Sequence, residues 1–195
     1  MKRKVKLQRV TKETKVKIEL NLDGKGKYKI YTSVPFLDHM LEQFSLHSGF
    51  DLYIKAIGDI FIDDHHLVED IGLALGQAFL KAIRDKKGIK RYGQILSVMD
   101  ESLSYIVVDI SGRPYLDFKV KFLPEYKKSS FDYRLIKEFF KSFVNEAKIT
   151  LYIKLLQGED NHHICESIFK GVGRVLKNAV ELNKNKNLLS TKGVL

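Results

Sequence analysis

Two short stretches of this chain carry the same pattern of histidines and a glutamate, His-His-x-x-Glu. They hold four of the six histidines, and each opens an apolar segment with helical spacing. On a helix the glutamate lies within about one turn of both histidines, whereas neighbouring imidazoles point about 100° apart and tend to serve different ions. One copy of the pattern is as often a polar helix start, but its repetition favours a pair of metal ions. The candidate ligands are His65, His66, Glu69, His162, His163 and Glu166.

Two residues outside these patterns are further candidate ligands, one from each half of the chain. His39 lies among apolar residues in Phe36–Gln43, and Glu138 takes the same place in the second half. A lone histidine there is more often a satisfied core residue, and Glu138 could equally be a solvated helix residue beside Lys137 and Lys141. Imidazole and carboxylate donors without a thiolate motif suit Mn, Fe(II) or Zn, and a mixed set at high coordination favours Mn.

Several cationic and hydroxyl side chains lie where a phosphate group could be bound. Arg91 and Arg113 are both in turn contexts, and a guanidinium group matches phosphate oxygens in a bidentate way. Lys170 follows Glu166 by one helical turn, and the tail carries Ser190 and Lys192. The alternative interpretation is two surface arginines and a frayed chain end.

The elements that must position these residues occur in the same order twice. In the first half the patterns predict strands at 14–22 and 27–33 joined by a hairpin turn at 23–26, a helix at 36–47, a strand at 50–57 and a helix from the first histidine pair to about Arg84. In the second half they predict a strand at 103–110 and its partner strand at 115–121 across a turn at 111–114, a helix at 133–145, a strand at 149–155 and a helix from the second histidine pair.

Identical residues support an internal duplication. The sequence Leu-Tyr-Ile-Lys occurs at 52–55 and again at 151–154, Gly76 and Gly173 follow their histidine pairs at the same distance, and Glu13 aligns with Glu101. We therefore predict an α+β fold: an internally duplicated strand–strand–helix–strand–helix unit whose two halves share one core. The expected organisation is a single catalytic domain, 1–195, with repeats at about 10–86 and 94–183 and a C-terminal tail at 184–195.

Composition narrows the class of protein. The 195 residues are 44% hydrophobic, typical of a globular chain, and no apolar run approaches the roughly 20 residues that span a bilayer. The charged N-terminus lacks the apolar core of a secretory signal, and the single cysteine fits a reducing cytoplasm. The net charge of +10 would attract any anion, nucleic acid or a small phosphate ester. Because the basic residues near the N-terminus alternate with apolar ones, as in a half-buried strand, we expect no nucleic-acid partner. Because no apolar run is long enough to span a bilayer, we expect no membrane.

A family resemblance rests on several of these motifs taken together. Thr11-Lys12-Glu13-Thr14, Phe36-Leu37-Asp38-His39-Met40, both histidine patterns, Met99-Asp100-Glu101, Ser111-Gly112-Arg113-Pro114 and the terminal Ser190–Leu195 occur in order along the chain. In this combination the chain resembles the imidazoleglycerol-phosphate dehydratases of histidine biosynthesis, in their monofunctional form.

The resemblance implies an activity and a cofactor. The expected reaction is loss of water from D-erythro-imidazole-glycerol phosphate to give imidazole-acetol phosphate, at a dinuclear site that binds the substrate imidazole as imidazolate. It implies two Mn(II) ions per active site and a homo-oligomeric shell of twenty-four subunits with active sites between neighbours.

Roles for individual residues also follow from the resemblance. The eight candidate ligands above would bind the metals, although the family usually has a histidine where this chain has Glu138. Glu13 would be the acid/base residue, and Gln43 and His47 would lie near the substrate. The phosphate would be held by Arg91, Arg113, Lys170, Ser190 and Lys192.

Two alternatives remain from the residues alone. The same ligands could activate water in a dinuclear metallohydrolase acting on phosphate esters. A basic nucleic-acid-binding module is the non-enzymatic alternative, but the chain lacks stacking aromatics interleaved with its basic residues.

Overall fold

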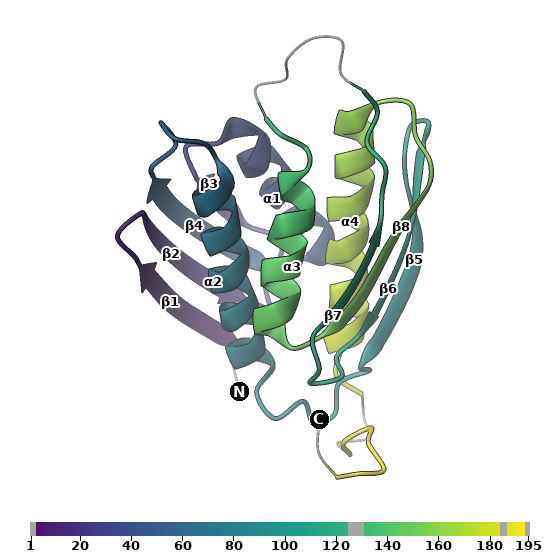
Figure 1. Cartoon of the computed structure of the whole chain (residues 1–195). Helices are drawn as coiled ribbons and strands as arrows, with labels where there is room; N and C mark the ends of the chain where they lie inside the picture. The colour runs from purple at the N-terminus through teal and green to yellow at the C-terminus, as the bar shows by residue number, and fades with distance from the viewer. Residues whose placement is uncertain (1–2, 125–130, 184–186, 194–195) are drawn as a thin grey trace.

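The structure is a computed structural model that describes residues 3–124, 131–183 and 187–193. Two four-stranded sheets lie on the outside and the helices lie between them (Figure 1). Each sheet is amphipathic and turns its apolar face toward the helices, so the two halves bury their apolar residues in one core. The prediction of a duplicated α+β fold with a shared core is confirmed.

The first half contains four strands and two helices. They are β1 (Lys4–Val10), β2 (Thr14–Asn21), β3 (Tyr28–Tyr31), α1 (Pro35–Ser48), β4 (Asp51–Gly58) and α2 (His65–Ile83). The strand order is β1-β2-β4-β3, with β4 antiparallel to β2 and parallel to β3. The expected hairpin between β2 and β3 is therefore wrong. The buried residues of β4, Leu52, Ile54 and Ala56, place it inside the sheet, between the two strands that the turn joins in sequence.

The second half repeats this arrangement. It contains β5 (Tyr92–Met99), β6 (Ser102–Asp109), β7 (Tyr115–Lys119), α3 (Leu135–Ala147), β8 (Thr150–Gln157) and α4 (Asn161–Val180), with strand order β5-β6-β8-β7. The expected pairing of β6 with β7 is wrong as well, because β8 lies between them. Each half thus begins with a strand, β1 or β5, that the sequence did not predict. In β1 only Leu7 is buried, and in β5 the buried residues are Gly93 and Ser97, so neither strand shows large apolar residues in alternation.

The long helices exchange partners between the halves. Helix α1 packs on α4 and α3 packs on α2, so each short helix lies against the long helix of the other half. The matched glycines allow this approach: a Cβ on Gly173 would lie 2.8 Å from the Phe44 carbonyl oxygen, and one on Gly76 would clash with the Phe143 carbonyl oxygen. The exchange brings residues from distant parts of the chain to the same end of the helical layer. None of the helices in the described part of the chain has the length and apolarity that crossing a membrane requires.

Candidate active site

One group of predicted ligands is assembled in the structure. Nε2 of His39 lies 2.9 Å from Oε1 of Glu166, and Nε2 of His162 lies 3.0 Å from the same oxygen. The three ligand atoms are all within 4.8 Å of one another, and Glu166 is buried. His39 comes from α1 of the first half, whereas the other two residues come from α4 of the second half. The cluster therefore depends on the exchange of helix partners.

Local structure fixes the cluster on the first turn of α4. The Asp160 side chain caps this helix by accepting hydrogen bonds from the backbone N–H groups of His162 and His163. Glu166 follows His162 by four positions, so both side chains lie on one helix face. On the neighbouring helix Pro35 begins α1, and the next turn presents His39 toward α4.

The charge of Glu166 is stabilised from several sides. Burial raises the pKa of this carboxyl, but hydrogen bonds from Lys170, His39 and His162 outweigh that effect and hold the pKa at about 2. Nζ of Lys170 lies 2.5 Å from Oε2, which leaves Oε1 facing the two imidazoles. One carboxylate oxygen, Oε1 of Glu166, thus lies beside the Nε2 atoms of two imidazoles.

This donor set fits a divalent metal. Ligands about 2.1 Å from an octahedral ion lie roughly 3 Å apart, which is the separation between Oε1 of Glu166 and each imidazole nitrogen. Two imidazoles and one carboxylate suit Mn, Fe(II) or Zn and leave positions for other ligands. Within residues 3–124, 131–183 and 187–193, this is the one group of histidines and carboxylates arranged for a metal.

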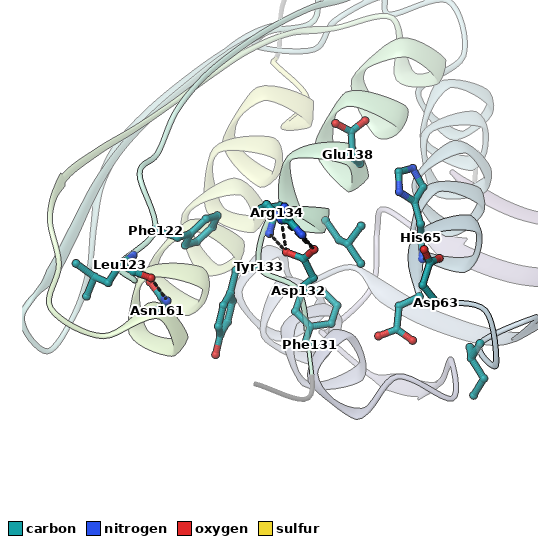
Figure 2. A pocket seen from close by; sticks show the side chains of 13 residues that line it. Asp63, His65, Phe122, Leu123, Phe131, Asp132, Tyr133, Arg134, Glu138 and Asn161 are labelled. Atoms are coloured by element: carbon teal, nitrogen blue, oxygen red, sulfur yellow. Dashed lines mark hydrogen bonds and ion pairs between the residues drawn. The ribbon is translucent and has the colours of Figure 1, made fainter. Parts of the chain in front are cut away.

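The first histidine pattern is more open. Nε2 of His65 lies 3.9 Å from Oε2 of Glu69, and both side chains are nearly half exposed. Glu138 forms an ion pair with Lys141, with 3.1 Å between Oε2 and Nζ. Figure 2 shows His65 and Glu138 on neighbouring helices at a cavity of about 950 Å³, which Asn161 also lines. Glu138 thus lies near the first pattern, and its expected role as a ligand stays a prediction.

The second histidine of each pattern faces a different carboxylate. Nδ1 of His66 lies 3.0 Å from Oδ2 of Asp59, and Nδ1 of His163 lies 2.8 Å from Oε2 of Glu101. These hydrogen bonds raise the pKa of both imidazoles, and His163 holds the pKa of Glu101 at about 2. The sequence did not predict either contact. The alignment of Glu101 with Glu13 was a signal for one of them, whereas Asp59 belongs to no motif.

Glu13 occupies the turn between β1 and β2, next to the first pattern. Its side chain is about half exposed, and Oε2 lies 3.9 Å from Nδ1 of His66. The turn is held by Thr11, whose hydroxyl accepts hydrogen bonds from the backbone N–H groups of Glu13 and Thr14. The Thr14 hydroxyl in turn donates to buried Asp70 of α2. This network fixes the Glu13 backbone relative to the helix that carries His66, and the sequence did not single out Asp70.

The two expected substrate contacts on α1 lie along one helix face. Gln43 and His47 follow His39 at intervals of four residues, and both are half-buried. Burial lowers the pKa of His47, and the positive charges of Lys170 and Arg174 lower it further. His47 therefore faces the same side of α4 as Lys170, next to the assembled cluster.

Arg91 lies at the far end of the helical layer. Its backbone N–H donates to the Ala179 carbonyl near the end of α4, whereas His162 is on the first turn. A helix rises 1.5 Å per residue, so these ends are about 25 Å apart. The Arg91 guanidinium donates through Nε and Nη2 to Asp109, at 2.6 and 3.0 Å, and through Nη1 to the Leu189 carbonyl.

The other expected phosphate residues gather near Arg91. Arg113 is exposed in the turn after β6, and its Nη1 donates to the Ser111 carbonyl at 3.3 Å. The tail passes beside Arg91 at Leu189, and the Ser190 hydroxyl accepts from the backbone N–H of Lys192 at 3.2 Å. Of the five expected phosphate residues, only Lys170 is adjacent to the cluster within one chain.

The fold and the cluster define a class, an internally duplicated α+β enzyme with a histidine–carboxylate centre suited to a divalent metal. The family model for imidazoleglycerol-phosphate dehydratase matches residues 32–176. The chain belongs to the imidazoleglycerol-phosphate dehydratase family, which consists of lyases.

Individual relatives agree with this membership along the whole chain. The imidazoleglycerol-phosphate dehydratase of Caldicellulosiruptor saccharolyticus is 53% identical over 97% of this chain and 96% of the relative. The crystal structure of the enzyme from Staphylococcus aureus is similar at a TM-score of 0.82 and 42% identity, covering 92% of this chain and 99% of that one. The Pyrococcus furiosus enzyme, in complex with (S)-C348, has a TM-score of 0.83 and 37% identity, covering 97% and 100%.

Proposed function

We propose that this chain converts D-erythro-imidazole-glycerol phosphate to imidazole-acetol phosphate and water in histidine biosynthesis, with two Mn(II) ions per active site. The observation that carries this proposal is the cluster of His39, His162 and Glu166, which joins the two halves of a chain of this family. In this reaction a C–H and a C–O bond break, the proton and hydroxide leave as water, and the resulting enol becomes the ketone.

The chain offers donors for two ions. One ion would be held by His39, His162 and Glu166. The other would be held by donors from the remaining candidate ligands, His65, His66, Glu69, Glu138 and His163. When bound, such ions would supply Lewis acids that hold the substrate ring as imidazolate and spread the developing negative charge. Lys170, which contacts Glu166, keeps that glutamate ionised and able to bind a cation.

Glu13 is proposed to move the proton. No hydrogen bond from a described residue reaches its carboxylate, and its half-exposed position leaves it able to approach a substrate beside His66. The threonine–Asp70 network restrains the turn, so the carboxylate is held near one place, beside His66. A positioned general base of this kind contributes about 10²–10⁴-fold to a rate.

The phosphate is proposed to be bound by a neighbouring copy of the chain. Arg91 lies about 25 Å from the cluster of the same chain, farther than one small substrate can reach, and Arg113 and the tail with Ser190 and Lys192 lie on the side of Arg91. In its contacts with described residues Arg91 uses three of its five N–H groups, so two are left among these contacts to bind a phosphate. An active site between subunits of a homo-oligomer, proposed as a shell of twenty-four copies, brings both sets together. We propose the cytoplasm as its location, since the one cysteine, Cys165, is a buried free thiol.

The activity is tested by incubating the Mn(II)-loaded protein with imidazole-glycerol phosphate and analysing the products. We expect an enolisable ketone, its loss with a chelator, and a fall in kcat of about 10²-fold or more for Glu13→Gln, with little change in KM. Release of inorganic phosphate instead would identify a metallohydrolase and overturn the proposal.

The shared site is tested by mixing two inactive variants. Glu166→Gln damages the cluster and Arg113→Ala damages the phosphate end, so a mixed oligomer contains some sites with both parts intact. We expect activity to return after dissociation and reassembly of the two together, and not of either alone. If no activity returns although mixed oligomers form, the cluster and the phosphate-binding residues do not belong to one shared site.

A further inference from the structure

In both histidine patterns the first and the second histidine make different kinds of contact. In each, the first histidine turns Nε2 toward the glutamate four residues later, at 3.9 Å for His65 and 3.0 Å for His162. The second histidine turns Nδ1 toward a carboxylate outside the pattern, Asp59 or Glu101. The planes of the paired rings meet at 66° in the first pattern and 88° in the second, so the two rings of each pair are oriented differently.

These contacts determine which ring nitrogen carries the hydrogen. At 3.0 and 2.8 Å the Asp59 and Glu101 oxygens lie at hydrogen-bond distance from Nδ1 of His66 and of His163, so we assign the N–H of each contact to Nδ1. A neutral imidazole with its hydrogen on Nδ1 has its lone pair on Nε2. The second histidine of each pattern is thus held with Nε2 available to an ion.

The two orienting carboxylates come from different positions in the repeat. Asp59 directly follows β4, and the residue that directly follows β8 is Gly158. A Cβ on Gly158 would lie 2.5 Å from Cγ1 of Ile164 and 3.0 Å from the Ser102 hydroxyl, so the second half has no room there for an aspartate. Glu101, the repeat equivalent of Glu13, reaches His163 instead.

Glu101 is also fixed by its own surroundings. Its Oε1 accepts from the backbone N–H groups of Glu159 and Asp160, at 3.2 and 3.1 Å, and from the Ser102 hydroxyl at 3.0 Å. Asp59 is nearly buried, and its Oδ1 has no hydrogen-bond partner among the described residues. The hydrogen bond that the structure gives the Asp59 carboxylate is thus the one between Oδ2 and Nδ1 of His66.

We propose that Asp59 and Glu101 are positioning residues that fix the Nδ1–H tautomer of His66 and His163, and that Glu101 is not an acid/base residue. Asp59 orients His66 in the first half, as Glu101 orients His163 in the second. Glu13, the repeat equivalent of Glu101, is therefore not needed to orient a histidine and can move a proton. The inference rests on the proposed function for the identity of the ion, but the tautomers are a property of the chain alone.

The first test measures Mn(II) affinity by calorimetry for the wild type, Asp59→Asn, Glu101→Gln and Glu13→Gln. Loss of an outer partner of a ligating histidine typically weakens metal binding 10- to 100-fold, and we expect this for the first two variants. Glu13→Gln should bind Mn(II) as the wild type does while losing activity. Glu159→Gln is the matched control, because it removes an exposed charge next to Glu101 without touching His163.

The second test uses ¹⁵N solid-state NMR of histidine-labelled, metal-free protein at a pH where imidazoles are neutral. We expect Nδ1–H for His66 and His163 in the wild type, and a mixture of tautomers for the ring that loses its partner. Signals are assigned with His66→Gln and His163→Gln.

Native metal affinity in Asp59→Asn and Glu101→Gln, or unchanged tautomers, would overturn the inference. If the wild type binds no Mn(II), the proposed metal site fails, and the tautomers alone decide the positioning role.

Discussion

The two histidine patterns have the same spacing, yet the second is closed around its glutamate and the first is not. Glu166 is buried and contacts His39, His162 and Lys170, whereas Glu69 is nearly half exposed and lies 3.9 Å from His65. The difference comes from the helix packed against each pattern. Helix α1 brings His39 to α4, but α3 brings Glu138 to α2, and the Glu138 carboxylate pairs with Lys141. A repeated motif therefore defines which donors are present, while the opposing helix determines whether they meet.

Removing metal should have the largest effect, because it acts on both patterns at once. We expect a chelator to abolish activity and, if the proposed sites lie between subunits and their ions bridge ligands from neighbouring copies, to dissociate the proposed oligomer as well. Light scattering before and after chelation measures the second effect, and Mn(II) added back should restore both. An unchanged particle with all metal removed would contradict the bridging role.

Glu166→Gln should separate the two patterns most clearly among single substitutions. The variant removes the anionic oxygen that faces two imidazoles and leaves Lys170 without its carboxylate partner, so we expect Mn(II) affinity to fall about 100-fold. Glu69→Gln is the matched change in the open pattern and should weaken binding less. Calorimetry on both variants gives the comparison, and an equal or larger loss for Glu69→Gln would show that the open pattern binds as tightly.

Substitutions of Glu138 test whether the open pattern closes on a metal. If Glu138 is a ligand, Glu138→Gln should weaken one of two ions by about tenfold, while Glu138→His should largely retain activity because it restores an imidazole at the position equivalent to His39. Lys141→Ala is the control, since it removes the ion pair and keeps the carboxylate. Native affinity for both ions in Glu138→Ala would exclude it as a ligand.

The smallest effects are expected at the two matched glycines. Overpacking costs about 1–3 kcal/mol in the free energy of unfolding, partly offset by the better helix propensity of alanine, about 1 kcal/mol. Gly173→Ala pushes α1 from α4 and so moves His39 from Glu166, whereas Gly76→Ala acts on α3 and α2. Denaturant unfolding should show similar losses for both, and the ion at His39, His162 and Glu166 should be bound a few-fold more weakly in Gly173→Ala only, because α2 and α3 carry none of these three residues. Equal metal affinities would show that the cluster tolerates the shift.

Much of the local structure follows from the sequence. The helix expected at 36–47 is Pro35–Ser48, and the one expected to reach about Arg84 ends at Ile83, because apolar residues at helical spacing mark a buried face directly. The duplication was visible in identical residues, and the donor types indicated a metal. Edge strand β1, with Leu7 as its single buried residue, carries too little apolar alternation for the sequence to predict it.

Only the tertiary structure decides which donors meet. His39 and Glu166 lie 127 positions apart, and no local periodicity records that α1 packs on the long helix of the other half. The same is true of Asp59 beside His66, which depends on where β4 ends relative to α2. Hydrophobic patterning shows that a helix face is buried, but it does not show which other helix packs on that face. The sequence therefore determined the donor types and the helices that carry them. The packing of α1 on α4, with Gly173 at the crossing, determined that His39, His162 and Glu166 form one site.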